Sequence, residues 1–292
     1  MQRAQFLAGT ATGIGALLAT GVPSLAQTDE TRERLAELEK HTGGRLGVFA
    51  IDTHDGRRIV HRVEERFPMC STFKFLAVSA VLSRVDSGVE HLGRHIAYTK
   101  ADLLAYAPVT TANVHDGYMT VEALCEAAIV DSDNTAANLL LGTMGGPPAV
   151  TRFARALGDT RTRLDRTEPA LNSAIPGDPR DTTTPASMAH DLQAVLLGNA
   201  LTAASRARLE TWMIGCRTGV SCIRAGVPKT WIVGDKTGSG VRGTRNDIAI
   251  LKPPNRGAIV VTAYLTGATI VDGDARDAAL ATVGSLVSTT LA

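Results

Sequence analysis

The sequence predicts an α/β (α+β) fold with two regions. Strand-like runs of β-branched and aliphatic residues stand near the start of the chain and return in its last third, joined by short loops that favour antiparallel pairing. Between them the pattern is helical and is interrupted by Gly and Pro. We therefore expect a five-stranded antiparallel sheet, flanked by helices and formed from both chain ends, with an inserted all-helical region and a ligand cleft between the two.

The first 26 residues are expected to be a signal peptide. Arg3 is their one charged residue, an apolar Ala- and Gly-rich stretch follows, and Ser24-Leu25-Ala26 resembles a signal-peptidase site. Four glycines interrupt the stretch, whereas a membrane-spanning helix needs about 20 firmly apolar residues. We expect a periplasmic or secreted protein without stable membrane association after cleavage, and the export route stays open.

The α/β region is expected over residues 27–66 and 216–292, and the all-helical region over residues 67–215. A charged amphipathic pattern ending at Gly43-Gly44 predicts the first helix, and β-branched runs bounded by Gly, Asn and Pro predict the strands. The expected strands cover residues 46–52, 58–63, 232–236, 247–251 and 258–266. The expected helices cover residues 29–40, 71–85, 121–130, 135–144, 148–157, 185–197, 203–214 and 277–287.

Composition narrows the possible partners. The 292 residues carry 30 Lys and Arg against 29 Asp and Glu, a net charge of +1, so no single-sign field is available to capture a nucleic acid or an anionic membrane. Aromatic residues make up 4%, too few for a base-stacking platform. We expect a monomer that acts on a small molecule through one site.

The four cysteines allow three disulfide pairings in an exported chain. Cys216 and Cys222 are six residues apart, and a local disulfide between them stays open. Cys125 lies inside an apolar helical pattern, where a buried free thiol is the common outcome.

Three short motifs could carry chemistry. Ser71-Thr72-Phe73-Lys74 begins an apolar helix, Ser132-Asp133-Asn134 lies between two helical patterns, and Lys236-Thr237-Gly238 ends a strand pattern. Each also has a purely structural interpretation. The first motif could simply start a helix, and the second could form a turn or an N-cap. The third could be a strand edge with a protective lysine. Helix geometry favours a catalytic role for the first motif. Residues i and i+3 share a helix face, so the Lys74 amine can reach the Ser71 hydroxyl. The helix N-terminus also offers N–H groups to an oxyanion.

Other kinds of site are not indicated. Residues 238–243 match the dinucleotide-binding GxGxxG string, but a strand pattern follows where that motif requires a helix. The seven histidines are scattered, and the chain has no GxSxG, phosphate-loop or HExxH motif. We expect neither a metal nor another cofactor.

Taken together and in this order, the three motifs resemble the set found in class A serine β-lactamases and penicillin-binding proteins. The resemblance to class A β-lactamases runs from about residue 28 to the C-terminus. Residues 164–172 resemble the Ω-loop of that family, here about residues 163–181, with Arg166 and Asp181 as the pair that holds it. Tyr106 resembles the tyrosine at the substrate mouth. The resemblance implies hydrolysis of β-lactams and resistance to them.

The resemblance also implies catalytic roles. Ser71 would attack the lactam carbonyl, its proton taken by Lys74 or by Glu168 through a water, and this choice stays open. The backbone N–H groups of Ser71 and Ser239 would hold the oxyanion, and Ser132 would relay a proton to the leaving nitrogen. Glu168, joined to the next residue by a bond that the family holds cis, would activate the water that releases the product.

Substrate contacts follow from the same resemblance. Lys236, Thr237 and Arg245 would bind the substrate carboxylate, and Ser239 is compatible with cephalosporins. The remaining contacts, to the acylamide oxygen and the hydrolytic water, would come from Asn134 and Asn172.

The sequence departs from the family at two cysteines. Some members bridge the cysteine before the nucleophile, here Cys70, to a position that is Gly240 in this chain. Another branch bridges the position of Cys125 to that of Val78. We therefore expect Cys70 to be a buried free thiol.

Two alternatives share the three motifs. A penicillin-binding DD-peptidase would lack a glutamate placed as Glu168 is, and a β-lactam sensor would be acylated at Ser71 without turnover. Because Glu168 and Asn172 accompany the motifs, the sequence favours hydrolysis. The range of β-lactams accepted stays open.

Overall fold

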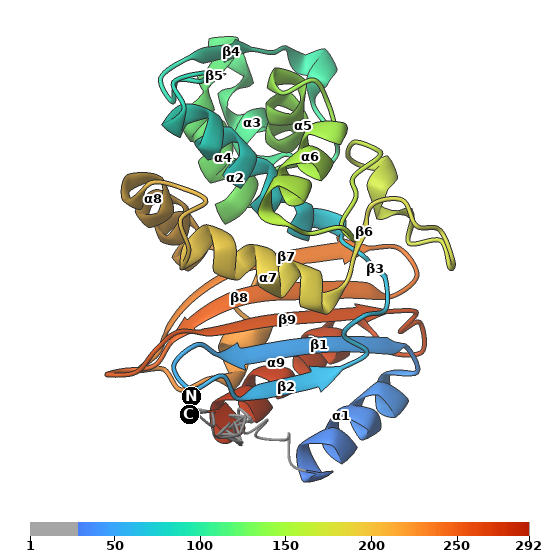
Figure 1. The fold of residues 1–292 in the computed structure, drawn as a ribbon. Coiled ribbons are helices and arrows are strands. Elements are labelled where there is room, and N and C mark those ends of the chain that lie inside the picture. The colour runs from blue at the N-terminus through green and yellow to red at the C-terminus, as the bar shows by residue number, and fades with distance from the viewer. Residues whose placement is uncertain (1–28, 292) are drawn as a thin grey trace, which may run out of the picture.

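A five-stranded antiparallel sheet in the order β2-β1-β9-β8-β7 forms the base of the computed structural model, which describes residues 29–291 (Figure 1). Strand β9, near the C-terminus, lies between β1 and β8, so Thr262 pairs with Phe49 on one side and with Ile248 on the other. The prediction of a sheet built from both chain ends is confirmed. Its strands are β1 (Arg45–Asp52), β2 (Arg58–His61), β7 (Ile232–Gly240), β8 (Thr244–Lys252) and β9 (Ile259–Thr266).

Helices cover both faces of the sheet. Strand β8 shows how this is encoded: Ile248 and Ile250 join one buried apolar cluster, while Ala249 and Leu251 join the other. Both alternating sets are apolar, because a strand covered on both faces has no solvent side. The helices concerned are α1 (Asp29–Thr42) and α9 (Gly273–Leu291) on one face, and α7 (Pro185–Leu196) and α8 (Ala203–Ile214) on the other (Figure 1).

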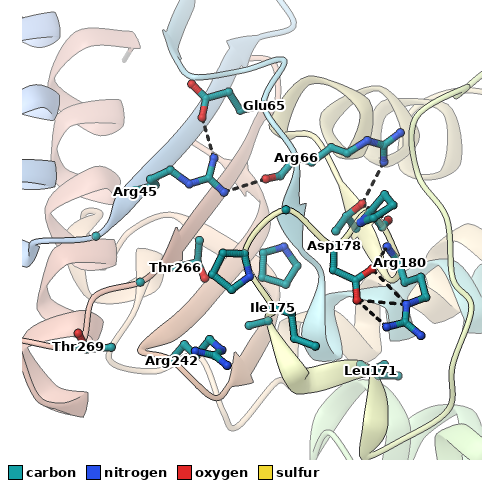
Figure 2. A pocket seen from close by; sticks show the side chains of 18 of the residues that line it. Arg45, Glu65, Arg66, Leu171, Ile175, Asp178, Arg180, Arg242, Thr266 and Thr269 are labelled. Carbon is teal, nitrogen blue, oxygen red and sulfur yellow. Dashed lines mark hydrogen bonds and ion pairs between the residues drawn. The ribbon is translucent and has the colours of Figure 1, made fainter.

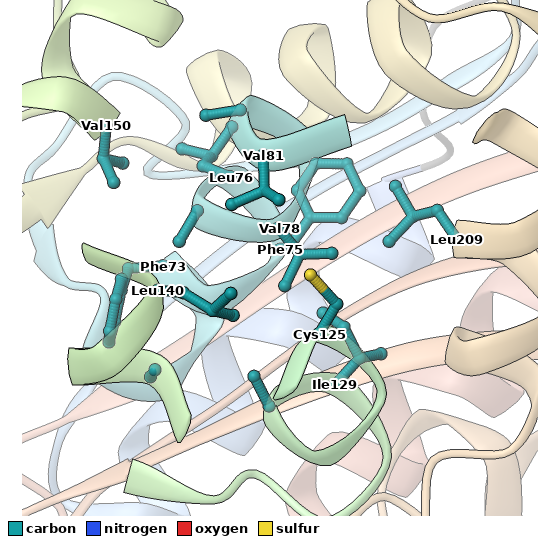
Figure 3. Packing of buried hydrophobic residues seen from close by; sticks show 14 of the residues in the cluster. Phe73, Phe75, Leu76, Val78, Val81, Cys125, Ile129, Leu140, Val150 and Leu209 are labelled. Atoms are coloured by element: carbon teal, nitrogen blue, oxygen red, sulfur yellow. The ribbon is translucent and has the colours of Figure 1, made fainter. Parts of the chain in front are cut away.

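Helix α2 (Phe73–Asp86) runs through the centre of the helical region, and its residues 73–82 are all buried. Figure 3 shows Val78 of this helix packed beside Cys125, within a cluster that draws on several surrounding helices. The first functional motif therefore stands on a rigid element. The other helices of the region are α3 (Pro108–Asn113), α4 (Val121–Val130), α5 (Asn134–Thr143) and α6 (Pro148–Leu157).

Short elements connect these helices, and they include strands within residues 67–215, which were expected to be all-helical. Two small antiparallel sheets pair β3 (Phe67–Pro68) with β6 (Thr182–Thr183) and β4 (His95–Ala97) with β5 (Tyr118–Thr120). The single-turn 3-10 helices are η1 (Cys70–Thr72), η2 (Lys100–Asp102), η3 (Val114–Asp116), η4 (Ala170–Ser173) and η5 (Ile223–Gly226).

Several boundaries differ from the sequence prediction. The helix expected at residues 71–85 begins as η1 and continues as α2. The strand expected at 58–63 ends at His61, because Arg62 has a positive φ of 46° that turns the chain out of the sheet. Strands β7 and β8 are longer than predicted, because their polar ends pair with each other up to Gly240 and Thr244. Helix α9 extends beyond residues 277–287 at both ends, and α3 was not predicted.

The local disulfide considered for Cys216 and Cys222 is not formed. Both are free buried thiols, and their sulfur atoms face different partners. The Cys216 Sγ lies 3.4 Å from the Thr218 hydroxyl, whereas the Cys222 Sγ lies 3.5 Å from Asp277 Oδ1. The other two cysteines are buried free thiols, as expected.

The signal peptide expected at residues 1–26 lies outside the described residues. Among residues 29–291, no helix is both long enough and apolar enough to cross a membrane.

Candidate active site

Ser71 and Lys74 meet at the start of α2. Ser71 belongs to the 3-10 turn η1, and Lys74 follows in the first turn of the α-helix, so the two side chains lie on one face. The Lys74 Nζ donates a 2.8 Å hydrogen bond to Ser71 Oγ. Lys74 is fully buried and Ser71 is 9% exposed. The serine hydroxyl is therefore held beside an amine and open on one side.

Glu168 contacts the same hydroxyl beside Lys74. Ser71 Oγ donates to Glu168 Oε1 at 3.1 Å, and the Lys74 Nζ lies 3.2 Å from the same oxygen. The second carboxylate oxygen accepts a 2.5 Å hydrogen bond from Asn172 Nδ2. Glu168 is buried, and its bond to Pro169 is cis. A serine, a lysine and a glutamate thus form a buried triangle.

Asn138 holds Glu168 by its main chain. Its Nδ2 donates to the Glu168 carbonyl and its Oδ1 accepts from the Glu168 N–H, each at 2.9 Å. Sequence reasoning missed this residue, because an asparagine inside an amphipathic helix pattern carries no signal of a partner 30 residues away. The one available sign was its position four residues after Asn134, on the same face of α5.

Ser132 lies between the two buried lysines. The Lys236 Nζ donates to Ser132 Oγ at 3.0 Å, and the Lys74 Nζ donates to the same oxygen at 3.3 Å. The neighbouring Asp133 caps α5 by accepting a 2.8 Å hydrogen bond from the Ala136 N–H. The capping interpretation of this motif therefore holds for its aspartate, while its serine faces the site.

Burial and charge shift the lysines toward neutrality. The pKa of Lys74 falls to about 8, mainly because burial disfavours its charged form; nearby Glu168 opposes this shift and Lys236 adds to it. Burial also lowers the pKa of Lys236. A lysine with a pKa near neutrality can exchange a proton with the serine at physiological pH.

Two glycines let strand β7 approach the nucleophile. A Cβ on Gly238 would lie 2.7 Å from the Met69 carbonyl oxygen and 3.2 Å from the Ser71 nitrogen. A Cβ on Gly240 would lie 2.7 Å from Cys70 Sγ, so position 240 does face this cysteine. Only glycine permits such close packing, and it brings the backbone of β7 against the turn that carries Ser71.

Arg245 lies behind the β7 edge of the site. Its Nε pairs with Asp277 at 2.6 Å, and its Nη1 donates to Ser239 Oγ at 2.9 Å. The Thr237 hydroxyl lies 2.5 Å from that of Thr218. Arg245 is thus fixed by an ion pair on one side and reaches the polar strand end on the other. Asp277 and Thr218 were not among the predicted site residues.

Tyr106 and Asn134 lie on the helical side. Tyr106 is 51% exposed, and its carbonyl accepts a 3.1 Å hydrogen bond from the Asn134 N–H. The Asn134 side chain accepts a 2.6 Å hydrogen bond from the Lys74 Nζ. These contacts place the backbone of Tyr106, a half-exposed residue, next to the asparagine that contacts Lys74.

The Ω-loop is anchored by Arg166 and Asp181. The Arg166 Nε lies 2.6 Å from Asp181 Oδ2, and Asp181 Oδ1 accepts from the N–H groups of residues 165 and 166. The guanidinium also donates to Ser173 Oγ at 2.9 Å. Since Glu168 lies between these contacts along the chain, its carboxylate is held on a braced segment.

The predicted residues therefore gather in one place. Hydrogen bonds connect a buried centre of Ser71, Lys74, Ser132, Glu168 and Lys236. Around it lie Tyr106, Asn134, Asn172, Thr237, Ser239 and Arg245. Within residues 29–291, no group of three or more His, Cys, Asp or Glu side chains is arranged to hold a metal ion. The arrangement can activate a serine for acyl transfer.

Comparison with known proteins agrees with this geometry. Residues 30–291 match the model of the β-lactamase enzyme family. The chain is 49% identical over 250 residues to β-lactamase CTX-M-8 of Citrobacter amalonaticus, covering 86% of each chain. It is 48% identical over 258 residues to β-lactamase OXY-2 of Klebsiella oxytoca, covering 86% of this chain and 89% of that protein.

Solved structures show the same relationship. An ancestral class A β-lactamase superposes with a TM-score of 0.86 at 61% sequence identity, covering 88% of this chain and 98% of the other. With matching sequence, fold and family model over most of its length, this chain belongs to the class A β-lactamases.

Proposed function

We propose that this chain hydrolyses β-lactams through an acyl-enzyme on Ser71 that a water activated by Glu168 then releases. The observation that carries the proposal is the buried triangle, with Ser71 Oγ 2.8 Å from the Lys74 Nζ and 3.1 Å from Glu168 Oε1. Such a protein confers resistance to β-lactam antibiotics.

Acylation begins with attack of Ser71 Oγ on the lactam carbonyl carbon. The serine proton passes to neutral Lys74, or to Glu168 through a water, and the carbonyl oxygen takes up negative charge. The backbone N–H groups of Ser71 and Ser239 form the oxyanion hole, which the close approach of β7 at Gly238 supports. Each such donor contributes about 3 kcal/mol to the transition state.

Cleavage of the carbon–nitrogen bond requires a proton on the leaving nitrogen. Ser132 supplies it, since its Oγ receives hydrogen bonds from both Lys74 and Lys236. The proton that left Ser71 can thus return through Lys74 and Ser132 to the opened ring. Both buried amines keep the hydroxyl oriented for this transfer.

Lys236, Thr237 and Arg245 bind the carboxylate of the substrate. Lys236 is buried, and its amine also donates to the Thr237 carbonyl at 2.9 Å, which fixes its direction. The Arg245 Nε stays paired with Asp277, and its Nη1, which lies at Ser239 on the strand end, reaches the carboxylate. An anionic substrate therefore meets two cations beside the nucleophile.

Asn134 and Asn172 bind the acylamide side chain and help to place the water, and Tyr106 lines the entrance. Asn172 Nδ2 holds Glu168, while its buried Oδ1 has no hydrogen-bond partner among the described residues. A buried acceptor without a partner favours a hydrogen bond from a water or substrate amide. Glu168 removes a proton from the water, which attacks the ester and frees Ser71.

Two statements about the whole chain belong to the same proposal. The active cleft lies between an α/β region of residues 27–66 and 216–292 and a helical region of residues 67–215. The protein is exported to the periplasm or the medium after removal of residues 1–26, and it works as a monomer without nucleic acid, metal or cofactor.

Steady-state hydrolysis of a chromogenic cephalosporin by the purified protein tests the proposal. We expect many turnovers for each protein molecule. Acylation of Ser71 in a one-to-one ratio without turnover would instead support a sensor, and release of D-alanine from a stem peptide without lactam hydrolysis would support a DD-peptidase. Either result contradicts the proposal.

A further inference from the structure

A second cavity of about 800 Å³ is lined in part by the Ω-loop (Figure 2). It is bounded by loop residues 174–180, by Arg45 at the start of β1, by residues 64–66, and by Arg242 in the turn between β7 and β8. Neither Ser71 nor any other member of the buried catalytic centre lines it. Its volume is typical of sites that take a small organic ligand.

Positive charge is concentrated around this cavity. Six arginines line it against three carboxylates, in a chain whose net charge is only +1. Two of the carboxylates are already paired within the wall, Glu65 with Arg45 at 2.7 Å and Asp178 with Arg180 at 2.8 Å. The lining therefore carries cations that its own carboxylates do not neutralise.

Three of the six arginines lack a carboxylate partner. In the part of the chain that the structure describes, no ion pair involves Arg66, Arg161 or Arg242. Arg66 instead donates to the Arg161 carbonyl at 2.7 Å and to Thr182 Oγ1 at 3.0 Å. Burial, and then the charges of Arg161 and Arg163, lower the pKa of Arg66 below its ordinary value. An anion in the cavity would relieve this repulsion.

Apolar residues form part of the remaining wall, beside three threonines. Ile175 is 45% exposed, and Figure 2 shows it at the centre of the lining, with Thr266 and the Arg242 guanidinium nearby. Leu171 and three prolines at positions 68, 176 and 179 complete the apolar surface. Arginine side chains beside an apolar surface suit a ligand that has both an anionic group and an apolar body.

We propose that this cavity binds an amphipathic organic anion, with its carboxylate, sulfonate or phosphate group at Arg242 and its apolar body against Ile175. The site is distinct from the catalytic cleft. The cavity nevertheless shares the Ω-loop with the catalytic site, because Arg166 and Leu171 line the cavity and the same loop carries Glu168.

Fluorescence titration with 8-anilinonaphthalene-1-sulfonate, an aromatic sulfonate, tests the proposal. We expect saturable binding that weakens as salt is added. The neutral analogue N-phenyl-1-naphthylamine should bind at least tenfold more weakly. Arg242→Gln should weaken sulfonate binding about tenfold, the loss expected for one charge-assisted hydrogen bond, and Arg242→Lys should restore most of it.

The matched control is Arg152→Gln, which removes an exposed arginine of α6 away from the cavity. It should leave sulfonate binding unchanged, and unchanged melting temperatures would show that all three variants are folded. Equal affinity of the native and Arg242→Gln proteins for the sulfonate, or equal affinity of the native protein for both probes, would overturn the proposal.

Amide NMR shifts locate the bound sulfonate without reference to catalysis. Changes concentrated at Gly177, Gly267 and Thr269, which line the cavity, are expected. Changes concentrated at Ser71 and Ser239 would overturn the proposal and leave the proposed hydrolysis untouched. Failure of cephalosporin hydrolysis would in turn say nothing against this cavity.

Discussion

The Lys74 Nζ and Glu168 Oε1 lie 3.2 Å apart, and neither side chain is exposed. The charge of Glu168 raises the pKa of Lys74, so removal of the glutamate changes the proton affinity of the lysine. Both atoms are also within hydrogen-bond reach of Ser71 Oγ. The two candidate bases for acylation are therefore coupled, and variants of Glu168 separate acylation from deacylation.

Glu168→Ala should trap the acyl-enzyme. Without the carboxylate, no general base remains on the hydrolytic water, and deacylation should slow by roughly 10² to 10⁴-fold. Mass spectrometry of the variant after mixing with penicillin should show Ser71 carrying the opened lactam. Glu126→Ala, at an exposed glutamate of α4, is the control and should turn over normally. Free enzyme in the Glu168 variant after several minutes would contradict the assigned role.

Glu168→Gln should lower the pKa of Lys74 below its native value of about 8. The glutamate charge holds this pKa up against burial, so its loss leaves a larger share of Lys74 neutral at pH 7. NMR titration of the Lys74 Cε signal measures the shift directly. Lys236→Gln removes a charge that lowers the same pKa and should move it the opposite way. Shifts of the same sign in both variants would refute this coupling.

Asp181→Asn should loosen the Ω-loop. The Asp181 side chain is 1% exposed and pairs with Arg166 at 2.6 Å, and removal of one member of such a buried pair costs about 3 kcal/mol. Chemical denaturation should show this loss, and rapid-mixing kinetics should show deacylation reduced more than acylation. Asp116→Asn, at an exposed carboxylate of η3 outside the Ω-loop, is the control and should change both quantities little. Native stability and native deacylation in Asp181→Asn would exclude the bracing role.

Asp191 should make the folded protein less stable as the pH rises. Burial, and then the charge of Asp159, raise its pKa from 3.8 to about 9, so the folded state holds a proton that the unfolded state has released. Between about pH 4 and pH 9 this group should lower the free energy of unfolding by on the order of 1 kcal/mol per pH unit. Asp191→Asn should reduce that slope, which denaturation at pH 5 to 8 measures.

Asp274→Asn, at an exposed carboxylate in the first turn of α9, is the control for this pH dependence. It should keep the native slope. Indistinguishable slopes for the native and Asp191→Asn proteins would show that Asp191 is charged in the folded state.

Elements with a strong apolar pattern were predictable from the sequence, and the polar ends of strands were not. Helices α4 (Val121–Val130) and α6 (Pro148–Leu157) begin and end where the periodicity predicts. The stretch from Thr237 to Gly240 has no apolar alternation, and it is a strand because β8 supplies its hydrogen-bond partners. The residues that make Thr237–Gly240 a strand are therefore those of β8, not its own.

The site shows the same division. Ser71 and Lys74 are recognisable because their spacing within one helix already brings a hydroxyl and an amine together. Asn138 is not recognisable, because it acts on the main chain of a loop that folds back from 30 residues away. Contacts set by local geometry can be read from the sequence, and contacts set by tertiary packing require the fold.

Strand β9, the last strand in sequence, lies between β1 and β8 and joins the N-terminal and C-terminal halves of the sheet. A chain cut after residue 258 would retain every residue proposed here to act on the substrate, since the last of them in sequence is Arg245. It would nevertheless leave one edge of β1 and one edge of β8 unpaired, and no strand would connect the two. Because this pairing joins distant parts of the chain, the catalytic cleft should assemble late during folding, after nearly the whole polypeptide is present.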